Sequence, residues 1–225
     1  MRAVLRGLAE TLVTAGLLLA FFVGYLAWGT SQYMHQEQGG LQDELEQRWS
    51  AARARQAAAT TRNGSGGAPG VKAGASAPAE GEALAILRVP RFGASYRYAV
   101  IEGVSEEDLR RGPGHYPGTA GPGQVGNMAV AGHRTTYGSP FNRNGDLKRG
   151  DRILVDTATA TYVYEVTGRV IVRPGETGVI APVPRKPGRK PVKRMLTLTT
   201  CHPKFSAAYR LVVFAELQGR RAPAA

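Results

Sequence analysis

The sequence predicts an all-β fold, an eight-stranded closed barrel with short helices, preceded by one N-terminal transmembrane helix. Eight short runs rich in β-branched and aromatic residues follow residue 84, and Gly, Pro and Asp punctuate them. An uncharged, largely apolar stretch at residues 11–28 is about long enough to cross a bilayer. We therefore expect the 225 residues to divide into an anchor (1–28), a stalk and linker (29–81) and a folded domain (82–225).

Charges on either side of the apolar stretch predict its orientation. Arg2 and Arg6 precede the stretch, whereas Glu37 and three further acidic residues up to position 46 follow it. The positive-inside rule then places the N-terminus in the cytoplasm and the folded domain outside a plasma membrane that the chain crosses once. A cleaved signal peptide is the alternative, but its apolar core would be shorter, and Ala27-Trp28-Gly29 is a poor cleavage site.

The segment after the anchor is expected to form a short stalk helix and then a flexible linker. Leu41, Leu45 and Trp49 are spaced by four and line one face of a helix within residues 31–59, although Gly39-Gly40 is expected to interrupt it. Residues 60–81 are rich in Gly, Ala, Ser and Pro and cannot support a core. As a flexible coil they would span roughly 25–30 Å and let the domain move near the membrane.

The folded domain is expected to be an all-β unit closed into a barrel. Ser105 has N-cap character before three acidic residues, which predicts a helix of one or two turns ended by Gly112 and Pro113. Ser139-Pro140 indicates a second short helix. The expected strands are residues 85–89, 97–102, 127–131, 152–156, 161–167, 169–173, 194–200 and 210–217.

Three residues with complementary chemistry stand at expected strand ends. Cys201, the single cysteine, ends one strand, His133 follows another, and Arg210 begins a third. A thiolate is a nucleophile, an imidazole transfers protons, and a guanidinium stabilises a developing oxyanion. The alternatives are an inert buried cysteine, a histidine that only caps a strand, and a surface arginine on an edge strand.

These residues carry a family resemblance. Leu198-Thr199-Thr200-Cys201 resembles the TLxTC signature of sortases, with His133 and Arg210 at the positions of the other two catalytic residues. Residues 112–119, residues 131–138 and Cys201-His202-Pro203 resemble the class E branch of high-GC Gram-positive bacteria. The resemblance covers about residues 83–217 and implies an eight-stranded sortase barrel.

The resemblance also implies a reaction, a substrate class and two substrate-binding residues, Tyr116 and Thr200. A cysteine transpeptidase of this kind cleaves an LAxTG- or LPxTG-type sorting signal of a secreted protein between Thr and Gly and joins the acyl group to a peptidoglycan precursor amine. It needs no cofactor. A tyrosine at the position of Tyr116 implies a preference for LAxTG, because a phenol can bind a backbone N–H that proline lacks. Tyr116 is otherwise a loop residue packed on its neighbours.

The net charge and the remaining ionisable residues indicate which polymers, lipids or metal ions the chain could bind. The chain carries +12, and residues 173–194 are notably basic, so they form either a substrate-contacting loop or a solvated one that attracts anionic lipids and wall polymers. No recognition-helix pattern indicates nucleic acid. The acidic residues 106–108 invite a calcium hypothesis, but helix-start electrostatics explain them more simply, and no zinc-ligand spacing is present. We therefore expect no metal.

Two further histidines and two alternative functions remain to be considered. His115 belongs to the loop around Tyr116, and His202 is expected to make local contacts. A cysteine transpeptidase that cross-links wall peptides directly would need a His-Gly-Cys-type neighbourhood, which Thr200-Cys201-His202 does not supply. The alternative from another class is a non-catalytic, membrane-tethered module that binds anionic wall polymers. It accounts for the charge and the anchor but not for His133, Cys201 and Arg210 together.

Overall fold

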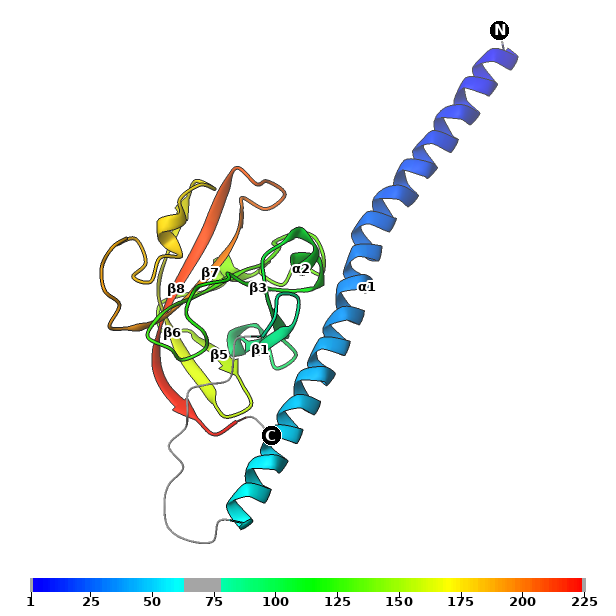
Figure 1. Cartoon of the computed structure of the whole chain (residues 1–225). Helices are drawn as coiled ribbons and strands as arrows, with labels where there is room; N and C mark the ends of the chain where they lie inside the picture. Colours follow the sequence, from blue (N-terminus) through cyan, green and yellow to red (C-terminus); the bar gives the residue numbers. More distant parts are fainter. Residues whose placement is uncertain (1, 63–77, 224–225) are drawn as a thin grey trace.

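A computed structural model describes residues 2–62 and 78–223, and the strands among them close into one barrel (Figure 1). The strand order around the barrel is β1-β2-β3-β4-β7-β8-β6-β5, and β5 pairs with β1 to close it. Only β2–β3 and β4–β7 are parallel pairs. The predicted eight-stranded barrel is therefore confirmed. The helices and strands are α1 (Arg2–Arg62), β1 (Ala83–Arg88), β2 (Arg97–Glu102), α2 (Glu106–Arg111), β3 (Gly114–His115), β4 (Gly126–Ala131), β5 (Arg152–Asp156), β6 (Thr161–Val172), β7 (Arg194–His202) and β8 (Tyr209–Arg221).

Two strands differ from the prediction. The expected pair at 161–167 and 169–173 is the single strand β6, because Gly168 falls at a register irregularity opposite β8 instead of in a turn. Strand β3 has only two residues, and the pattern of its sequence gave no signal for it. The predicted number of strands was correct because these two errors cancel.

Along each strand, side chains point alternately into the barrel interior and toward its outer face. On β7, Leu196 and Leu198 lie in the main apolar core. Thr197, Thr199 and Cys201 therefore share the outer face of the same strand. A thiol at this place does not disturb the packed interior.

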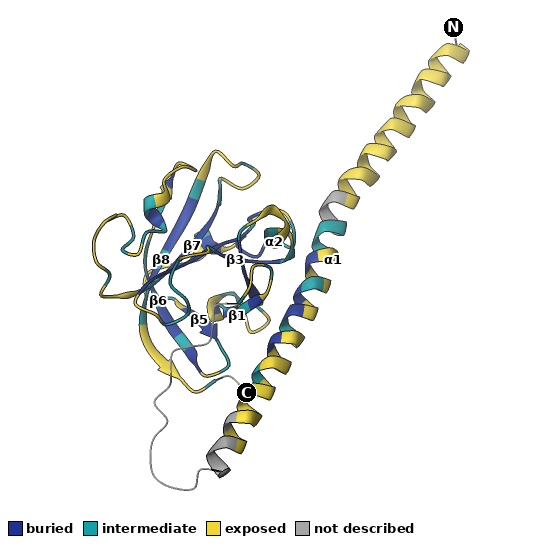
Figure 2. Cartoon of the chain, in the orientation of Figure 1, coloured by how far each residue is buried: buried dark blue, intermediate teal, exposed yellow. Residues whose placement is uncertain are grey.

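Helix α1 is continuous from Arg2 to Arg62, so the predicted interruption at Gly39-Gly40 is wrong. Tertiary packing accounts for this difference, because Gln38 and Leu41 on either side of the glycines are buried against the barrel, and such packing outweighs a cost of about 1 kcal/mol per glycine. Figure 2 shows α1 exposed along its N-terminal half and buried where it passes the barrel. Most of the predicted linker, residues 63–77, lies outside the described residues.

The stalk part of α1 docks on β1 and β2 through the face predicted from its leucines. Leu41 and Leu45 pack with Ile86 and Ile101 in one buried cluster, and Trp49 lies at its edge. In the described residues, the stalk is therefore packed against the barrel, whereas we expected a domain that moves freely on a tether.

The N-terminal part of α1 is the one helix in the described chain that is long and apolar enough to cross a membrane. Its described residues up to Tyr25 are exposed, among them large apolar side chains such as Leu12 and Phe22. Exposed apolar surface of this length is typical of a membrane span. An apolar N-terminal helix was predicted, and the structure contains one.

The short helices and turns follow their local chemistry. Ser105 caps α2 through a reciprocal capping box with Asp108, as predicted, and Gly112 ends the helix. The predicted helix at Ser139-Pro140 is absent from the described residues: Ser139 has a positive φ of 51°, whereas a residue that caps a helix start is usually in the extended β-region. Three 3₁₀ turns complete the described elements: η1 (Pro90–Phe92), η2 (Asn144–Asp146) and η3 (Thr177–Val179).

Candidate active site

Cys201 and Arg210 face each other across two neighbouring strands. They are register partners in the antiparallel pair β7–β8. The Cys201 thiol is free and half-buried. Nη1 of Arg210 donates to the carbonyl oxygens of Ala207 (2.9 Å) and Tyr209 (3.0 Å), so the loop between the two strands holds the guanidinium at this strand end.

His133 lies on the other side of Cys201. Strand β4 runs parallel to β7 with Ala131 beside Thr199, and the Gly132 N–H donates to the Thr199 carbonyl at 3.1 Å. The Thr200 hydroxyl donates to the Gly132 carbonyl, and Arg134 Nη1 donates to the Cys201 carbonyl, so His133 lies between two residues that contact the Cys201 end of β7. The fold thus gathers the histidine, cysteine and arginine singled out in the sequence at one end of the barrel.

The surroundings of His133 favour its neutral form. Burial lowers the pKa of the imidazole below its usual value of 6.5, the nearby positive charge of Arg110 lowers it further, and Glu106 partly opposes this effect. The ring lies 5.0 Å from the ring of Tyr137. Nε2 of His133 is buried and has no hydrogen-bond partner within the described residues. A neutral imidazole of this kind can accept a proton.

Tyr116 reaches the same outer face of β7. Its hydroxyl lies 3.2 Å from Oγ1 of Thr199, two residues before Cys201. Its backbone N–H donates to the Ala129 carbonyl on β4. The half-exposed phenol is therefore held beside the predicted nucleophile.

Thr200 is placed differently from the expectation of a substrate contact. Its side chain is buried, 3% exposed, and Oγ1 donates to the Gly132 carbonyl at 2.7 Å. Alternation along β7 puts it on the face opposite Cys201. Its hydroxyl joins β7 to the segment that carries His133.

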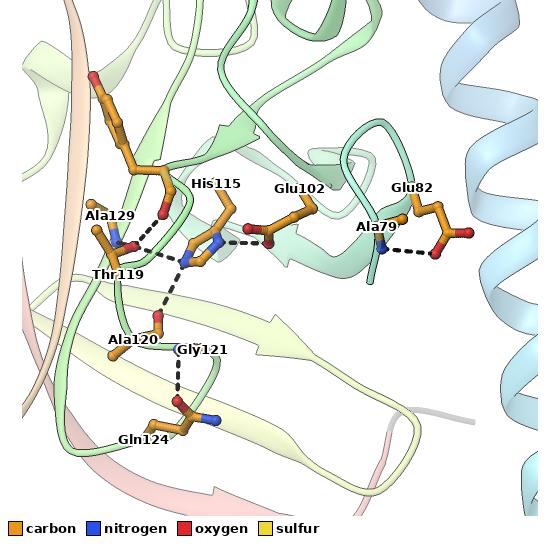
Figure 3. Close-up of polar contacts among 10 residues, drawn as sticks. Ala79, Glu82, Glu102, His115, Thr119, Ala120, Gly121, Gln124 and Ala129 are labelled. Atoms are coloured by element: carbon orange, nitrogen blue, oxygen red, sulfur yellow. Dashed lines mark hydrogen bonds and ion pairs between the residues drawn. The ribbon is translucent and has the colours of Figure 1, made fainter. Parts of the chain in front are cut away.

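His115 is a buried structural histidine, as Figure 3 shows. Its Nδ1 lies 2.7 Å from a carboxylate oxygen of Glu102, and its Nε2 lies 2.9 Å from Thr119 Oγ1 and 3.1 Å from the Ala120 carbonyl. These contacts fix the loop that follows β3. His115 therefore helps to hold the position of Tyr116.

Arg134 also belongs to this site, although no role was predicted for it from the sequence. Nη1 donates to the Cys201 carbonyl at 3.1 Å and to Nδ1 of His202 at 2.7 Å. Burial lowers the pKa of the guanidinium, while the charges of Asp146 and Cys201 oppose this effect. The position next to His133 in the sequence was the signal that could have pointed to it. The contact with His202 agrees with the local role expected for that histidine.

The basic loop between β6 and β7 is anchored at its start and open further on. Asn127 on β4 donates from Nδ2 to the carbonyls of Val179 (3.3 Å) and Ala181 (3.1 Å). Beyond them, basic side chains and the strand residues Met195 and Phe214 line a cavity of about 650 Å³. Met195 precedes Cys201 by six residues, and Phe214 is paired with Thr197, four residues before Cys201, so the strand residues of this cavity lie about 13–20 Å of strand from the thiol. The basic residues that line it and form no ion pair within 2–62 and 78–223 are Arg185, Lys186, Arg189 and Lys190.

Two of the three acidic residues that suggested calcium, Glu106 and Asp108, have local partners. The Asp108 carboxylate accepts from the backbone N–H and the hydroxyl of Ser105, and Glu106 pairs with Arg110 one turn along α2. Among the described residues, no cluster of three His, Cys, Asp or Glu side chains is arranged to hold a metal ion. The acidic turn is accounted for by helix capping.

Comparison with known proteins decides the family. The family model for the sortase domain matches residues 87–218, more than half of the chain. The chain belongs to the sortase family. The matched range contains His133, Cys201 and Arg210.

Relatives of this sortase support the predicted resemblance to the class E branch. Sortase SrtE1 of Streptomyces coelicolor is 31% identical over 224 residues, a match that covers 96% of this chain but only 58% of that relative's length. The solved structure of sortase E1 from the same organism, with a tripeptide in the active site, has a TM-score of 0.58 at 36% identity and covers 63% of this chain and 91% of that one. The SrtA sortase of Actinomyces oris has a TM-score of 0.61 at 38% identity and covers 66% and 89%, respectively.

Proposed function

We propose that this sortase is a membrane-anchored cysteine transpeptidase with His133, Cys201 and Arg210 as its catalytic residues. The contacts between the segment after β4 and the end of β7 support the proposal, since the residues on both sides of His133 contact Thr200 and Cys201, and Arg210 is the register partner of Cys201. A nucleophile with an adjacent base and an adjacent cation is what acyl transfer requires.

The first half-reaction forms an acyl-enzyme. Neutral His133 accepts the thiol proton of Cys201, and the thiolate sulfur attacks the carbonyl carbon of the threonine in the sorting signal. Arg210 stabilises the oxyanion, for which it has several guanidinium N–H groups besides those on Nη1. The bond to glycine then breaks, and the imidazolium gives its proton to the departing amine.

The second half-reaction transfers the acyl group. An amine of a peptidoglycan precursor attacks the thioester carbonyl, and His133 accepts the proton that the amine loses. The Cys201 thiolate leaves, takes back this proton, and the secreted protein is joined to the wall by an amide bond. Because the enzyme is acylated before the acceptor reacts, we expect ping-pong kinetics.

The substrate is proposed to be the LAxTG- or LPxTG-type sorting signal of secreted proteins. Two observations support a peptide in this place: the solved relative from Streptomyces coelicolor carries a tripeptide in its active site, and Tyr116 lies beside the outer face of β7. A phenol there can donate a hydrogen bond to a backbone carbonyl or accept one from a backbone N–H. Because proline has no backbone N–H, the second kind of bond favours alanine over proline at the second position.

We further propose the expected membrane topology. Residues 1–28 form the cytoplasmic N-terminus and the single span, residues 29–81 the stalk and linker, and residues 82–225 the catalytic domain outside the plasma membrane. The exposed apolar half of α1 supports the span, and the charge difference across it supports the orientation.

A ligation assay tests this function. The full chain in detergent micelles is incubated with a peptide containing LAxTG and an amine acceptor, and the products are identified by mass. We expect an acyl-transfer product with wild type and none with Cys201→Ala or His133→Ala. If Cys201→Ala also leaves wall attachment of reporter proteins unchanged in cells, the non-catalytic module that binds anionic wall polymers becomes the better account.

A further inference from the structure

The loop that follows His133 has an unfavourable backbone conformation. Tyr137, Gly138 and Ser139 have φ values of 47°, 64° and 51°. Left-handed backbone is disfavoured for residues with a Cβ, and two of these three consecutive residues have one. Such a run persists only where surrounding contacts hold it.

A residue of the stalk provides one of these contacts. Met34 of α1 is fully buried and lies against Gly138 so closely that a Cβ on this glycine would overlap the Met34 methyl group. Within the loop itself, the Phe141 N–H donates to the His133 carbonyl at 3.0 Å. The turn is therefore held between its own hydrogen bonds and α1.

The loop connects this contact to the catalytic histidine. The Tyr137 ring lies 5.0 Å from the His133 ring, at an interplanar angle of 40°. The guanidinium of Arg110 on α2 lies 5.8 Å from the centre of the Tyr137 ring. Tyr137 thus has neighbours from the catalytic segment and from α2.

Helix α1 also fixes α2, which carries Arg110. Gln38 of α1 is 4% exposed, and its Nε2 donates to the Arg111 carbonyl at 3.0 Å. The Arg111 side chain pairs with Glu37 at 2.9 Å. Through Met34, Glu37 and Gln38, α1 therefore contacts both the loop that contains Tyr137 and α2.

We propose that the stalk helix is a positioning element of the active site: Met34 holds the turn at Gly138 and thereby sets Tyr137 against His133. This inference rests on the proposed function. Met34 follows the apolar stretch by six residues, or about 9 Å of helix. Met34 contacts the loop that follows His133, whereas Leu41 and Leu45, further along the helix, contact β1 and β2, so the catalytic end is the one nearer the apolar half of α1 (Figure 1). The position of the membrane anchor and the position of the catalytic base are thereby coupled.

The test compares variants of the full chain in detergent micelles. Met34→Ala removes the contact with Gly138, Met34→Leu restores most of its volume, and Gln36→Ala changes an exposed residue on the same helix. Leu41→Ala is the matched control for lost packing, since it removes a buried side chain two turns further along the helix without touching the loop. The readouts are kcat/KM for an LAxTG peptide and the pKa of His133 from an NMR titration.

We expect Met34→Ala to lower kcat/KM by about tenfold or more, because a misplaced catalytic group is costly. A loosened loop exposes His133, so its pKa should rise toward 6.5, while Arg110 and Glu106 remain the nearby charges. Met34→Leu, Gln36→Ala and Leu41→Ala should stay close to wild type in both readouts.

Two results would overturn the inference. One is a folded Met34→Ala variant with the kcat/KM and His133 pKa of wild type. The other is an equal change in Leu41→Ala, which would reduce Met34 to general packing. A wild-type chain without turnover would count against the proposed function. Because the titration needs no substrate, the His133 pKa of Met34→Ala compared with that of wild type would still decide the positioning role.

Discussion

Oγ1 of Thr200 donates a hydrogen bond of 2.7 Å to the carbonyl oxygen of Gly132. This contact joins β7, which carries Cys201, to the segment that leads into His133, and both of its partners are buried. A side chain that faces away from the thiol thereby fixes the position of Cys201 relative to His133.

Thr200→Val should therefore impair both catalysis and stability. Valine keeps the shape of threonine but leaves the buried Gly132 carbonyl without its donor, at a cost of about 1–3 kcal/mol. We expect kcat/KM to fall by about ten- to a hundredfold and Tm to fall by roughly 2–12 °C. Thr200→Ser keeps the hydroxyl and should retain most of the activity. Equal kcat/KM for the valine and serine variants would contradict this role.

The charge of Arg110 should set the acid limb of the pH profile. In the proposed mechanism, kcat/KM falls at low pH when His133 is protonated and can no longer accept the thiol proton. Arg110→Gln removes a charge that lowers the pKa of His133, so the acid limb should move to higher pH.

Two companion variants make the pH test specific. Glu106→Gln removes a charge that raises the pKa of His133 and should move the acid limb to lower pH. Arg110→Lys keeps the positive charge and should leave the limb near its wild-type position. Because Arg110 is exposed, added salt should reduce both shifts. If the acid limb of Arg110→Gln and of Glu106→Gln stayed at its wild-type position, like that of Arg110→Lys, His133 would be excluded as the titrating group.

Tyr116→Phe should weaken the choice between alanine and proline in the sorting signal. Removal of one hydroxyl costs about 1 kcal/mol when it forms a hydrogen bond to the peptide, which corresponds to about fivefold. We expect kcat/KM for LAxTG to fall by this factor and kcat/KM for LPxTG to change less. A ratio unchanged from wild type would exclude the hydroxyl as the source of selectivity.

A soluble fragment that begins at residue 29 should be more stable than one that begins at residue 82. The shorter fragment exposes the surface of Ile86 and Ile101 that Leu41 and Leu45 cover. Loss of two buried leucines corresponds to about 3–6 kcal/mol, or roughly 6–24 °C in Tm for a domain of this size. Calorimetry of the two fragments measures the difference. Equal Tm values would mean that the stalk contributes no packing.

The barrel was predictable from the sequence because its strands carry strong local signals. β-Branched runs bounded by Gly and Pro locate β2, β4, β5 and β7 within a residue or two. The errors fall where tertiary pairing overrides the local pattern. Gly168 looks like a turn residue but lies within β6, and the two residues of β3 have a strand conformation only because β2 and β4 flank them.

The candidate site was only partly predictable for the same reason. His133, Cys201 and Arg210 have distinctive chemistry at strand ends and could be chosen without coordinates. The contacts of Met34 and Arg134 depend on long-range packing, which no local periodicity encodes. Gly39-Gly40 is the clearest example, because helix propensity alone predicts a break where docking on the barrel maintains the helix.

The most direct test of the account is the intact mass of the full chain after exposure to an LAxTG peptide without acceptor amine. We predict an added mass equal to the peptide up to its threonine, located at Cys201 by peptide mapping and absent from Cys201→Ala. Addition of an amine should remove the adduct and release the ligated product. A folded wild-type chain that forms neither adduct nor product would contradict the proposed thioester and favour the non-catalytic wall-binding module.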